Sequence, residues 1–148
     1  MEVEIVAVRL LHPASFAVTE MDSGDPLQVK IEYLAHNPIR EPIFGITISR
    51  KDELVCYDTC TETIGPHLPM IHGPGQITVQ LDRLDLIGGQ YYVDVGIYER
   101  EWAYAYDYHW HAYPLAIRPT RGEKGILRVP HRWKVEAHRK GLPKSEAG

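Results

Sequence analysis

Cysteine, positive charge and long apolar runs are all scarce in this sequence of 148 residues. Its opening, MEVEIVAVRL, is partly acidic and only briefly apolar, so it fits neither a secretion signal nor a membrane span, which needs roughly 20 apolar residues. The expected location is therefore the cytoplasm. Cys56 and Cys60 agree with it, because on one extended strand they would lie about 13 Å apart, too far for a disulfide.

The shortage of lysine and arginine argues against nucleic acid as a partner. The formal net charge is −4, and no basic cluster accompanies the aromatic residues. Binding to phosphates depends on a basic face that displaces counterions. We therefore expect no nucleic-acid partner.

Catalytic motifs are also missing. The sequence contains neither a G-x-S-x-G nucleophile elbow nor a G-x-x-x-x-G-K-[ST] phosphate loop. A glycosidase would need two carboxyl groups about 5–9.5 Å apart, and nothing marks Asp58, Asp94 or Asp107 as such a pair. We therefore expect a protein without enzymatic activity, without a cofactor and without a bound metal.

One alternative stays open at this point. Asp107, His109 and His111 would share one face of a strand, and an H-x-H pair can offer two imidazoles to zinc. His131 could supply a further ligand, which would give a metal-dependent enzyme. The competing interpretation is that these histidines bond to neighbouring backbone or carboxylate groups.

The sequence is rich in segments where apolar and polar residues alternate with a period of two. The alternation is strong in residues 27–35, 44–49, 76–81 and 91–97 and weaker in residues 3–11, 54–59, 112–118 and 125–133. Turns rich in Gly and Pro separate these segments. The pattern predicts an all-β protein, an immunoglobulin-like antiparallel β-sandwich of about eight strands over residues 1–133, followed by a polar tail, 134–148.

A tyrosine corner favours the immunoglobulin-like version of the sandwich. In LDLIGGQYYVDV, Leu86 and Gly89 precede Tyr91, which opens a strand. A tyrosine at that place hydrogen-bonds back to the preceding connection. The simpler interpretation is that Tyr91 only fills core space.

The outward-facing positions of the 91–97 strand suggest a surface for sugars. If the odd positions face the core, Tyr92, Asp94 and Tyr98 face outward, and Thr47 and Ser49 join them from the neighbouring strand. Rings can stack on the apolar faces of sugars while carboxylate and hydroxyl groups bond to sugar hydroxyls. We expect this face to be the platform of a carbohydrate site.

The segment EREWAYAYDYHWHAYPLAI extends that surface. Trp and Tyr occupy every second position from 102 to 110, and each combines a large ring with a polar group, which suits a wet binding surface. We expect the segment to form the rim and at least two of these aromatics to contact ligand. The candidate carbohydrate-binding residues are Tyr92, Asp94, Tyr98, Trp102, Tyr106, Tyr108, Thr47, Ser49, Tyr57 and Asp58. The alternative is a protein–protein or dimer interface that binds no sugar, since Tyr and Trp are also enriched at interfaces.

An ordered set of stretches carries a family resemblance: DPLQVKIEYLA, PIFGITISRKDELV, DRLDLIGGQYYVDVGIY, DYHWHAYPLAI and GILRVPHRW. It resembles the C-terminal domain of the ATP-binding subunit of O-antigen polysaccharide ABC transporters, the Wzt type. The set covers most of residues 1–133. The L-x-L-x-x-G-x-Y run and the closing G-I-L…H-R-W are its most specific parts.

The resemblance implies a sandwich that binds the exported polysaccharide, often at its modified non-reducing end. It implies a homodimer made by exchange of the last strand, 125–133. It also implies nucleotide-binding and membrane subunits as partners, at the inner face of the membrane. The family usually has Asp-Gly where this sequence has Asp52-Glu53, and often Asn-Thr where Cys60-Thr61 stands. The second departure leaves a ligand role for Cys60 in doubt and points to a different glycan.

Overall fold

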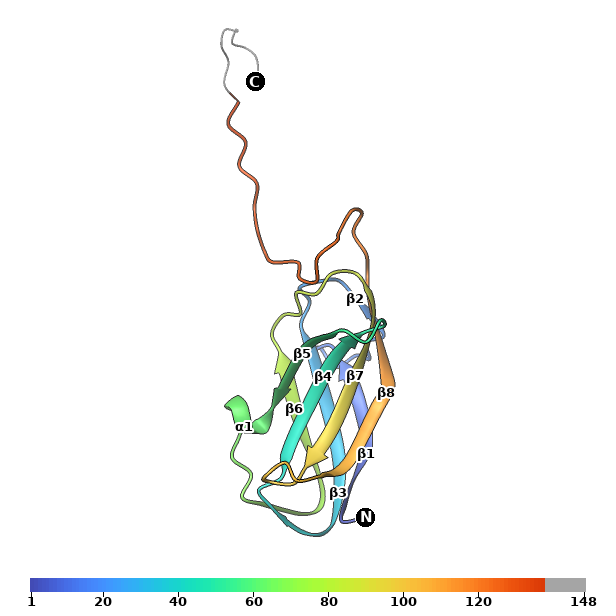
Figure 1. Ribbon diagram of the computed structural model, residues 1–148, viewed down its shortest axis with the longest axis vertical. Helices are drawn as coiled ribbons and strands as arrows, with labels where there is room; N and C mark the ends of the chain where they lie inside the picture. Colours follow the sequence, from blue (N-terminus) through green and yellow to red (C-terminus); the bar gives the residue numbers. More distant parts are fainter. Residues whose placement is uncertain (138–148) are drawn as a thin grey trace.

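The computed structural model describes residues 1–137, which form two β-sheets packed face to face (Figure 1). The elements are β1 (Val3–Leu11), β2 (Glu20–Met21), β3 (Leu27–Arg40), β4 (Ile43–Arg50), β5 (Val55–Cys60), α1 (Thr61–Ile64), β6 (Met70–Leu81), β7 (Gly89–Tyr98) and β8 (Ala105–Ile117). Within these residues, no helix has the length and apolar character needed to cross a membrane.

The strand order confirms the predicted sandwich. One sheet has the order β1-β3-β6, and the other has the order β2-β8-β7-β4-β5. Every pairing is antiparallel except that of the short β2 with β8. Cys56 and Cys60, both on β5, are free thiols, as predicted.

Two strand predictions at the C-terminal end need correction. β8 begins at Ala105 rather than at 112, so Tyr106, Tyr108 and Trp110 belong to the sheet and not to a connecting rim. Within the single chain, residues 125–133 form no strand, so a strand there would need a second copy to pair with. The predicted tail lies outside the described residues from position 138 onward.

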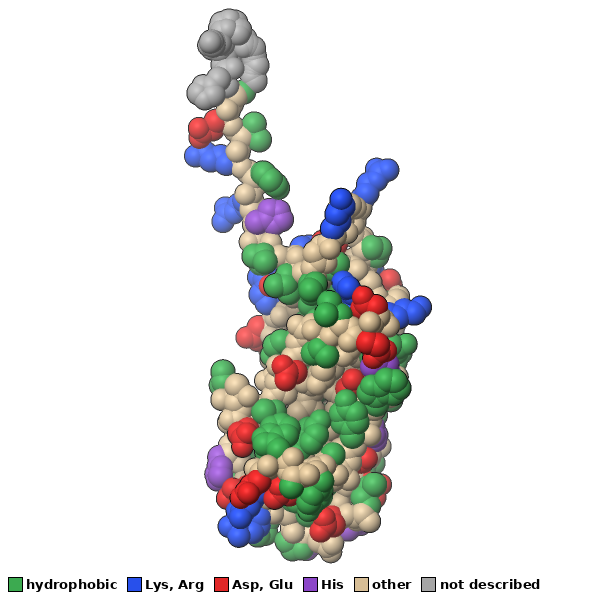
Figure 2. Space-filling model, viewed as in Figure 1, with side chains coloured by type: hydrophobic (Ala, Val, Ile, Leu, Met, Phe, Trp, Pro, Cys, Tyr) green, Lys and Arg blue, Asp and Glu red, His purple; other side chains and the backbone are tan. Residues whose placement is uncertain are grey.

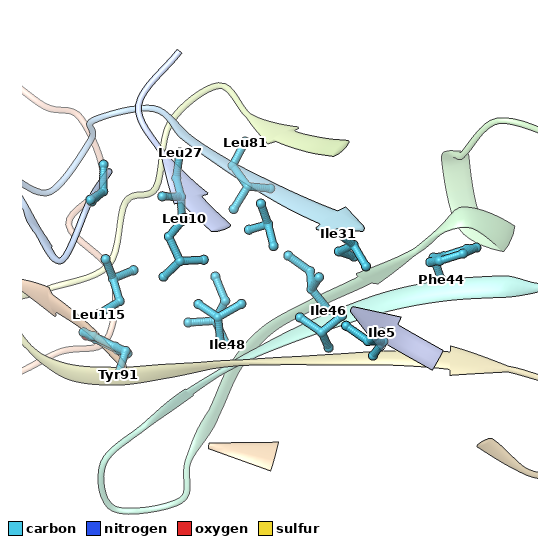
Figure 3. Packing of buried hydrophobic residues seen from close by; sticks show 14 of the residues in the cluster. Ile5, Leu10, Leu27, Ile31, Phe44, Ile46, Ile48, Leu81, Tyr91 and Leu115 are labelled. Atoms are coloured by element: carbon cyan, nitrogen blue, oxygen red, sulfur yellow. The ribbon is translucent and has the colours of Figure 1, made fainter. Parts of the chain in front are cut away.

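The core is built where the inward positions of both sheets meet. Ile31 from the three-stranded sheet packs in one cluster with Ile48 and Leu115 from the five-stranded sheet (Figure 3). Tyr91 is 1% exposed and donates its hydroxyl hydrogen to the carbonyl oxygen of Ile87 at 2.6 Å. The predicted tyrosine corner is therefore confirmed, and it fixes the start of β7.

The free edge of β1 is tied to the opposite sheet. A bulge between Ile5 and Ala7 interrupts the register of β1 with β3. The backbone N–H of Ile5 donates to Oδ2 of Asp107 on β8 at 2.7 Å. A backbone donor at a sheet edge is thereby satisfied by a side chain of the other sheet.

After β8, residues 118–137 cross the end of the sandwich and then leave it. Leu127 makes an isolated bridge with Leu86. Beyond this bridge the chain runs away from the sandwich as an extended arm (Figure 1). Trp133 and Val135 on this arm are each 87% exposed, so the arm carries apolar side chains that the single chain does not bury.

Candidate functional site

Two bulges in β8 shape the outer face of the five-stranded sheet. The register of β8 with β7 slips at Tyr106, and it slips again at residues 110–112, which lie opposite the single residue Asp94. A bulge bends its strand and re-aims the side chains that follow. The alternation that would place all the aromatics of this segment on one edge is therefore broken twice.

The lower end of the outer face is built around Tyr98 at the end of β7. Its ring lies over Gly96, where an added Cβ would come within 2.3 Å of the Tyr98 hydroxyl, and beside Gly45 on β4. The rings of Trp102 and Tyr98 lie 4.9 Å apart, centroid to centroid. The indole N–H of Trp102 donates to Oε1 of Glu62 on α1 at 2.8 Å. Because Gly45 and Gly96 have no side chains, the Tyr98 ring can lie flat on the sheet. The hydrogen bond to Glu62 holds the Trp102 ring beside the Tyr98 ring.

The turn between β7 and β8 positions Trp102 by its own contacts. The carboxylate of Glu99 accepts the backbone N–H groups of Glu101 and Ala103 at 2.9 and 3.2 Å. The backbone N–H of Trp102 donates to the carbonyl oxygen of Glu99 at 2.8 Å. The turn therefore presents the indole in a defined direction.

The upper end of the outer face is a stack of three rings, those of Tyr92, His111 and Trp110. The His111 ring is stacked against Trp110 at 3.9 Å and against Tyr92 at 4.3 Å, with interplanar angles of 12° and 11°. Oδ1 of Asp94 accepts the backbone N–H of His111 at 2.6 Å and lies 3.2 Å from its Nδ1. The two carboxylate oxygens of Glu53 lie 3.2 and 3.1 Å from Nε2. Both ring nitrogens of His111 are therefore occupied.

These two ends form one surface, which we name the aromatic platform: Tyr92, Tyr98, Trp102, Tyr108, Trp110 and His111. Trp110 is 62% exposed, Trp102 48% and Tyr108 43%. On this face of the molecule, hydrophobic side chains form a band in the lower half with acidic side chains along its border (Figure 2). The rings are thus held by the sheet while much of their surface is open to solvent.

Backbone strain is concentrated at the platform. Five non-glycine residues within 1–137 have left-handed backbone, and three of them belong to the platform or touch it: Glu53 (φ 75°), Trp102 (63°) and His111 (54°). Such a conformation costs an L-residue roughly 1–2 kcal/mol. Strain of this kind persists where the surroundings determine the conformation, which is common at binding sites.

The surroundings of two platform phenols, those of Tyr98 and Tyr108, favour their protonated form. Burial raises the pKa of Tyr98 and the pKa of Tyr108. The buried carboxylate of Asp94, which accepts the backbone N–H of His111, also raises the pKa of Tyr108. The surface can therefore stack flat apolar faces on its rings and bond to hydroxyl groups along its acidic border.

Six of the residues predicted for the site lie on this outer face: Tyr92, Tyr98, Trp102, Tyr108, Thr47 and Asp58. Thr47 and Asp58 are paired across β4 and β5. Thr47 is half-buried and Asp58 is exposed. The structure therefore brings together two hydrogen-bonding side chains and four rings from five separate stretches of chain.

The other four predicted residues need correction. Asp94 and Ser49 point to the expected side, but they are only 2% and 4% exposed. Asp94 lies under the second β8 bulge, where it accepts the backbone N–H of His111. Tyr57 pairs with the fully buried Ile48 and therefore lies on the core-facing side of β5. Tyr106 falls in the first β8 bulge and packs against the core.

The histidine alternative is contradicted by the same bulge. His109 pairs with the buried Val95 on the core-facing side, where its Nδ1 lies 2.6 Å from the Tyr113 hydroxyl. His111 faces outward, and His131 lies on the C-terminal segment. Among residues 1–137, no group of three or more His, Cys, Asp or Glu side chains is arranged to hold a metal ion. The prediction that His109 and His111 share a face is therefore wrong.

Three members of the site, His111, Glu53 and Glu62, were not predicted from the sequence, and Trp110 was predicted only as part of the aromatic segment. His111 was assigned to the metal alternative, although its place beside Trp110 in the aromatic run was a signal for a stacked ring. Glu53 and Glu62 gave no signal, because they reach the platform from the β4–β5 hairpin and from α1, outside the strands that carry the rings. Their role becomes visible only once the sheet brings these segments together.

Comparison with known proteins gives three related findings. A family model described as the Wzt C-terminal domain matches residues 1–129. The O-antigen export system ATP-binding protein RfbB of Myxococcus xanthus is 23% identical over 134 residues, which are 90% of this chain and 30% of that protein. The crystal structure of the C-terminal domain of wzt aligns with a TM-score of 0.76 at 13% identity, covering 91% of this chain and 84% of that one. This structural match shows the same fold.

Proposed function

The chain belongs to the Wzt C-terminal domain family, and on that premise we propose that it binds a cell-surface polysaccharide on the aromatic platform. The observation that carries the proposal is the platform itself, with two groups of rings fixed on one open sheet face. A polysaccharide chain lying along β7 would meet Tyr98 and then Tyr92, which are about 20 Å apart at about 3.3 Å per residue. Several sugar units can therefore be in contact at once.

The proposed role is recognition of the substrate in an O-antigen-type ABC export system, without catalysis. The curated relative is named as an ATP-binding protein of such a system, and this chain spans 30% of its length. We expect the chain to work with nucleotide-binding and membrane subunits at the inner face of the cell membrane. The energy of transport would come from those partners.

A homodimer by exchange of the C-terminal strand belongs to the same proposal. Within residues 125–133, pairing of the backbone with another strand ends at the bridge of Leu127 with Leu86. The arm that follows exposes the side chains of Trp133 and Val135. Residues 118–148 contain nine of the 16 Lys and Arg but only three of the 20 Asp and Glu. A basic arm with apolar side chains fits the acidic body of a second copy. Two platforms in one dimer would raise affinity for a long polysaccharide through avidity.

The test of the platform is alanine substitution of Tyr98 and of Trp102. One ring stacked on a nucleic-acid base contributes about 1–3 kcal/mol, and a ring stacked on a sugar should contribute no more than that. On a microarray of bacterial O-antigens, each variant should therefore bind more weakly than the native protein to the polysaccharide that the native protein binds. The loss of affinity should lie within roughly 5- to 100-fold. Thermal unfolding of each variant checks that the fold is retained.

Tyr57→Ala is the matched control, because Tyr57 is 39% exposed but lies on the other face of the sheet. It should leave binding unchanged. Full affinity in both Tyr98→Ala and Trp102→Ala would show that the face is wrongly assigned. A native protein that binds no polysaccharide on the array would favour the alternative of a protein–protein interface.

A further inference from the structure

Glu53 adopts a strained conformation in the hairpin that joins β4 and β5. Its φ is 75°, in a region that glycine enters without strain. Its backbone N–H donates to the carbonyl oxygen of Arg50, and the backbone N–H of Arg50 donates to the carbonyl oxygen of Leu54, both at 2.8 Å. The hairpin is thus a tight turn that would form more easily with glycine at position 53. A glutamate there brings a carboxylate to Nε2 of His111.

The imidazole of His111 faces a carboxylate at each ring nitrogen. Nδ1 lies 3.2 Å from Oδ1 of Asp94, and Nε2 lies 3.1 Å from Oε2 of Glu53. Only the protonated imidazole can donate from both nitrogens at the same time. Burial lowers the pKa of His111, but the hydrogen bonds to Asp94 and Glu53 outweigh burial and raise it above its ordinary value of 6.5.

We propose that Glu53 is a positioning residue of the polysaccharide site, which together with Asp94 clamps protonated His111 between the rings of Tyr92 and Trp110. The identification of the ligand as a polysaccharide rests on the proposed function, whereas the clamp is inferred from the contacts of His111. The clamp preforms the upper half of the aromatic platform. A platform whose rings are already fixed loses less conformational entropy on binding.

The clamp depends on pH through His111. Because the pKa is raised in the folded protein, the stabilisation is fully present below the ordinary value and is lost as pH rises through the raised value. The Glu53 side chain is 63% exposed and that of Asp94 only 3%, so Glu53 is the partner that departs when the proton is lost. Polysaccharide affinity should therefore fall as pH rises from about 6 to 8.

The ionisable groups around the imidazole come from three elements. Asp94 and Tyr92 lie on β7, and Tyr108 on β8 is near enough to Asp94 for that carboxylate to raise its pKa. On the hairpin, Glu53 has as neighbours Lys51 and Asp52, and Asp52 is paired with Arg50. Since Arg50 holds the Asp52 carboxylate, Glu53 is the hairpin carboxylate bonded to His111.

The experiment compares Glu53→Gly with Glu41→Gly. Glu41 also has left-handed backbone, with φ 49°, but lies in the turn between β3 and β4, where its carboxylate is 3.9 Å from Arg100. Both variants relieve backbone strain, and only Glu53→Gly removes a partner of His111. The readouts are calorimetric affinity for the O-antigen oligosaccharide with the strongest array signal and the NMR titration of the His111 ring.

We expect Glu53→Gly to lower affinity roughly tenfold at pH 6, the size of one hydrogen bond to a charged group. His111 should titrate at lower pH in this variant, and the decline of affinity between pH 6 and 8 should disappear. Glu53→Gln keeps an acceptor for Nε2 and should retain more affinity than Glu53→Gly. Glu41→Gly should match the native protein in both readouts.

An unchanged His111 titration in Glu53→Gly would overturn the clamp, as would an equal loss of affinity in Glu41→Gly. If the native protein binds no polysaccharide, the proposed function fails. The His111 titration still decides the clamp in that case: a shift confirms that Glu53 holds the ring, and no shift overturns it.

Discussion

Tyr91 shows how one hydroxyl group can fix the start of a strand. Its side chain is 1% exposed, and burial raises its pKa to about 12, so the hydroxyl stays protonated and donates to the Ile87 carbonyl. In Tyr91→Phe that buried carbonyl would lose its donor. We expect a loss of about 1–2 kcal/mol in the free energy of unfolding, measured in urea.

Tyr57→Phe is the control for this substitution, because Tyr57 is 39% exposed and water can replace a hydrogen bond of its hydroxyl. It should change stability by less than about 0.5 kcal/mol. If Tyr91→Phe were as stable as Tyr57→Phe, the corner would be a consequence of packing alone.

Within β7, Gly96 decides whether the Tyr98 ring can lie flat on the sheet. A Cβ at this position would come within 2.3 Å of the Tyr98 hydroxyl and 2.5 Å of its ring. In Gly96→Ala the ring must swing away from the sheet and from Trp102. We expect a clear loss of polysaccharide affinity on the array, with a smaller cost of about 1 kcal/mol in unfolding free energy, since a side chain and not the backbone gives way.

Gly125→Ala is the matched control, because the nearest atom to its added Cβ is the Leu127 carbonyl oxygen at 3.9 Å. This variant should behave as the native protein does. Unchanged affinity in Gly96→Ala would mean that the Tyr98 ring does not contact the ligand.

Strands with clear alternation were predictable from the sequence because the pattern is local. The core side of β7 follows from Tyr91, Val93, Val95 and Ile97, which are all at most 1% exposed. The tyrosine corner follows from a run of residues within one segment, and it too was predicted correctly.

Bulges could not be predicted, because a bulge is a property of two paired strands. The sequence of residues 110–112 does not indicate that all three lie opposite one residue of β7. This bulge places His109 and His111 on opposite faces of the sheet. The position of Tyr57 involves no bulge: it lies opposite Ile48 within the regular register of β4 and β5, so alternation along β5 already places it on the opposite face from Asp58. The burial of Asp94 depends on rings from β8 that fold over it, which alternation in β7 alone does not contain.

Exchange of the C-terminal strand between two whole molecules would fix the oligomeric state of the protein. We expect the full chain to be a dimer in sedimentation at micromolar concentration. Removal of residues 125–148 should give a monomer or an aggregating protein with exposed sheet edges. The reason is that this deletion takes away the bridge at Leu127 and the apolar arm beyond it.

Removal of residues 138–148 alone is the control, and this shorter deletion should leave the dimer intact. A stable dimer that persists after deletion of 125–148 would exclude exchange of this strand. Because most of the positive charge lies in residues 118–148, the dimer of the full chain should also weaken as salt is added.

The contact between Asp107 and the backbone of Ile5 limits how copies of this sandwich can join. A strand arriving at β1 would find that donor already taken and would have to break the tie between the sheets to add itself there. Edge-to-edge stacking, which can continue without limit and produce fibres, is thereby disfavoured at that point of the edge. In the proposed dimer a reciprocal swap of arms would close after two copies, so assembly by that route would not continue into a filament.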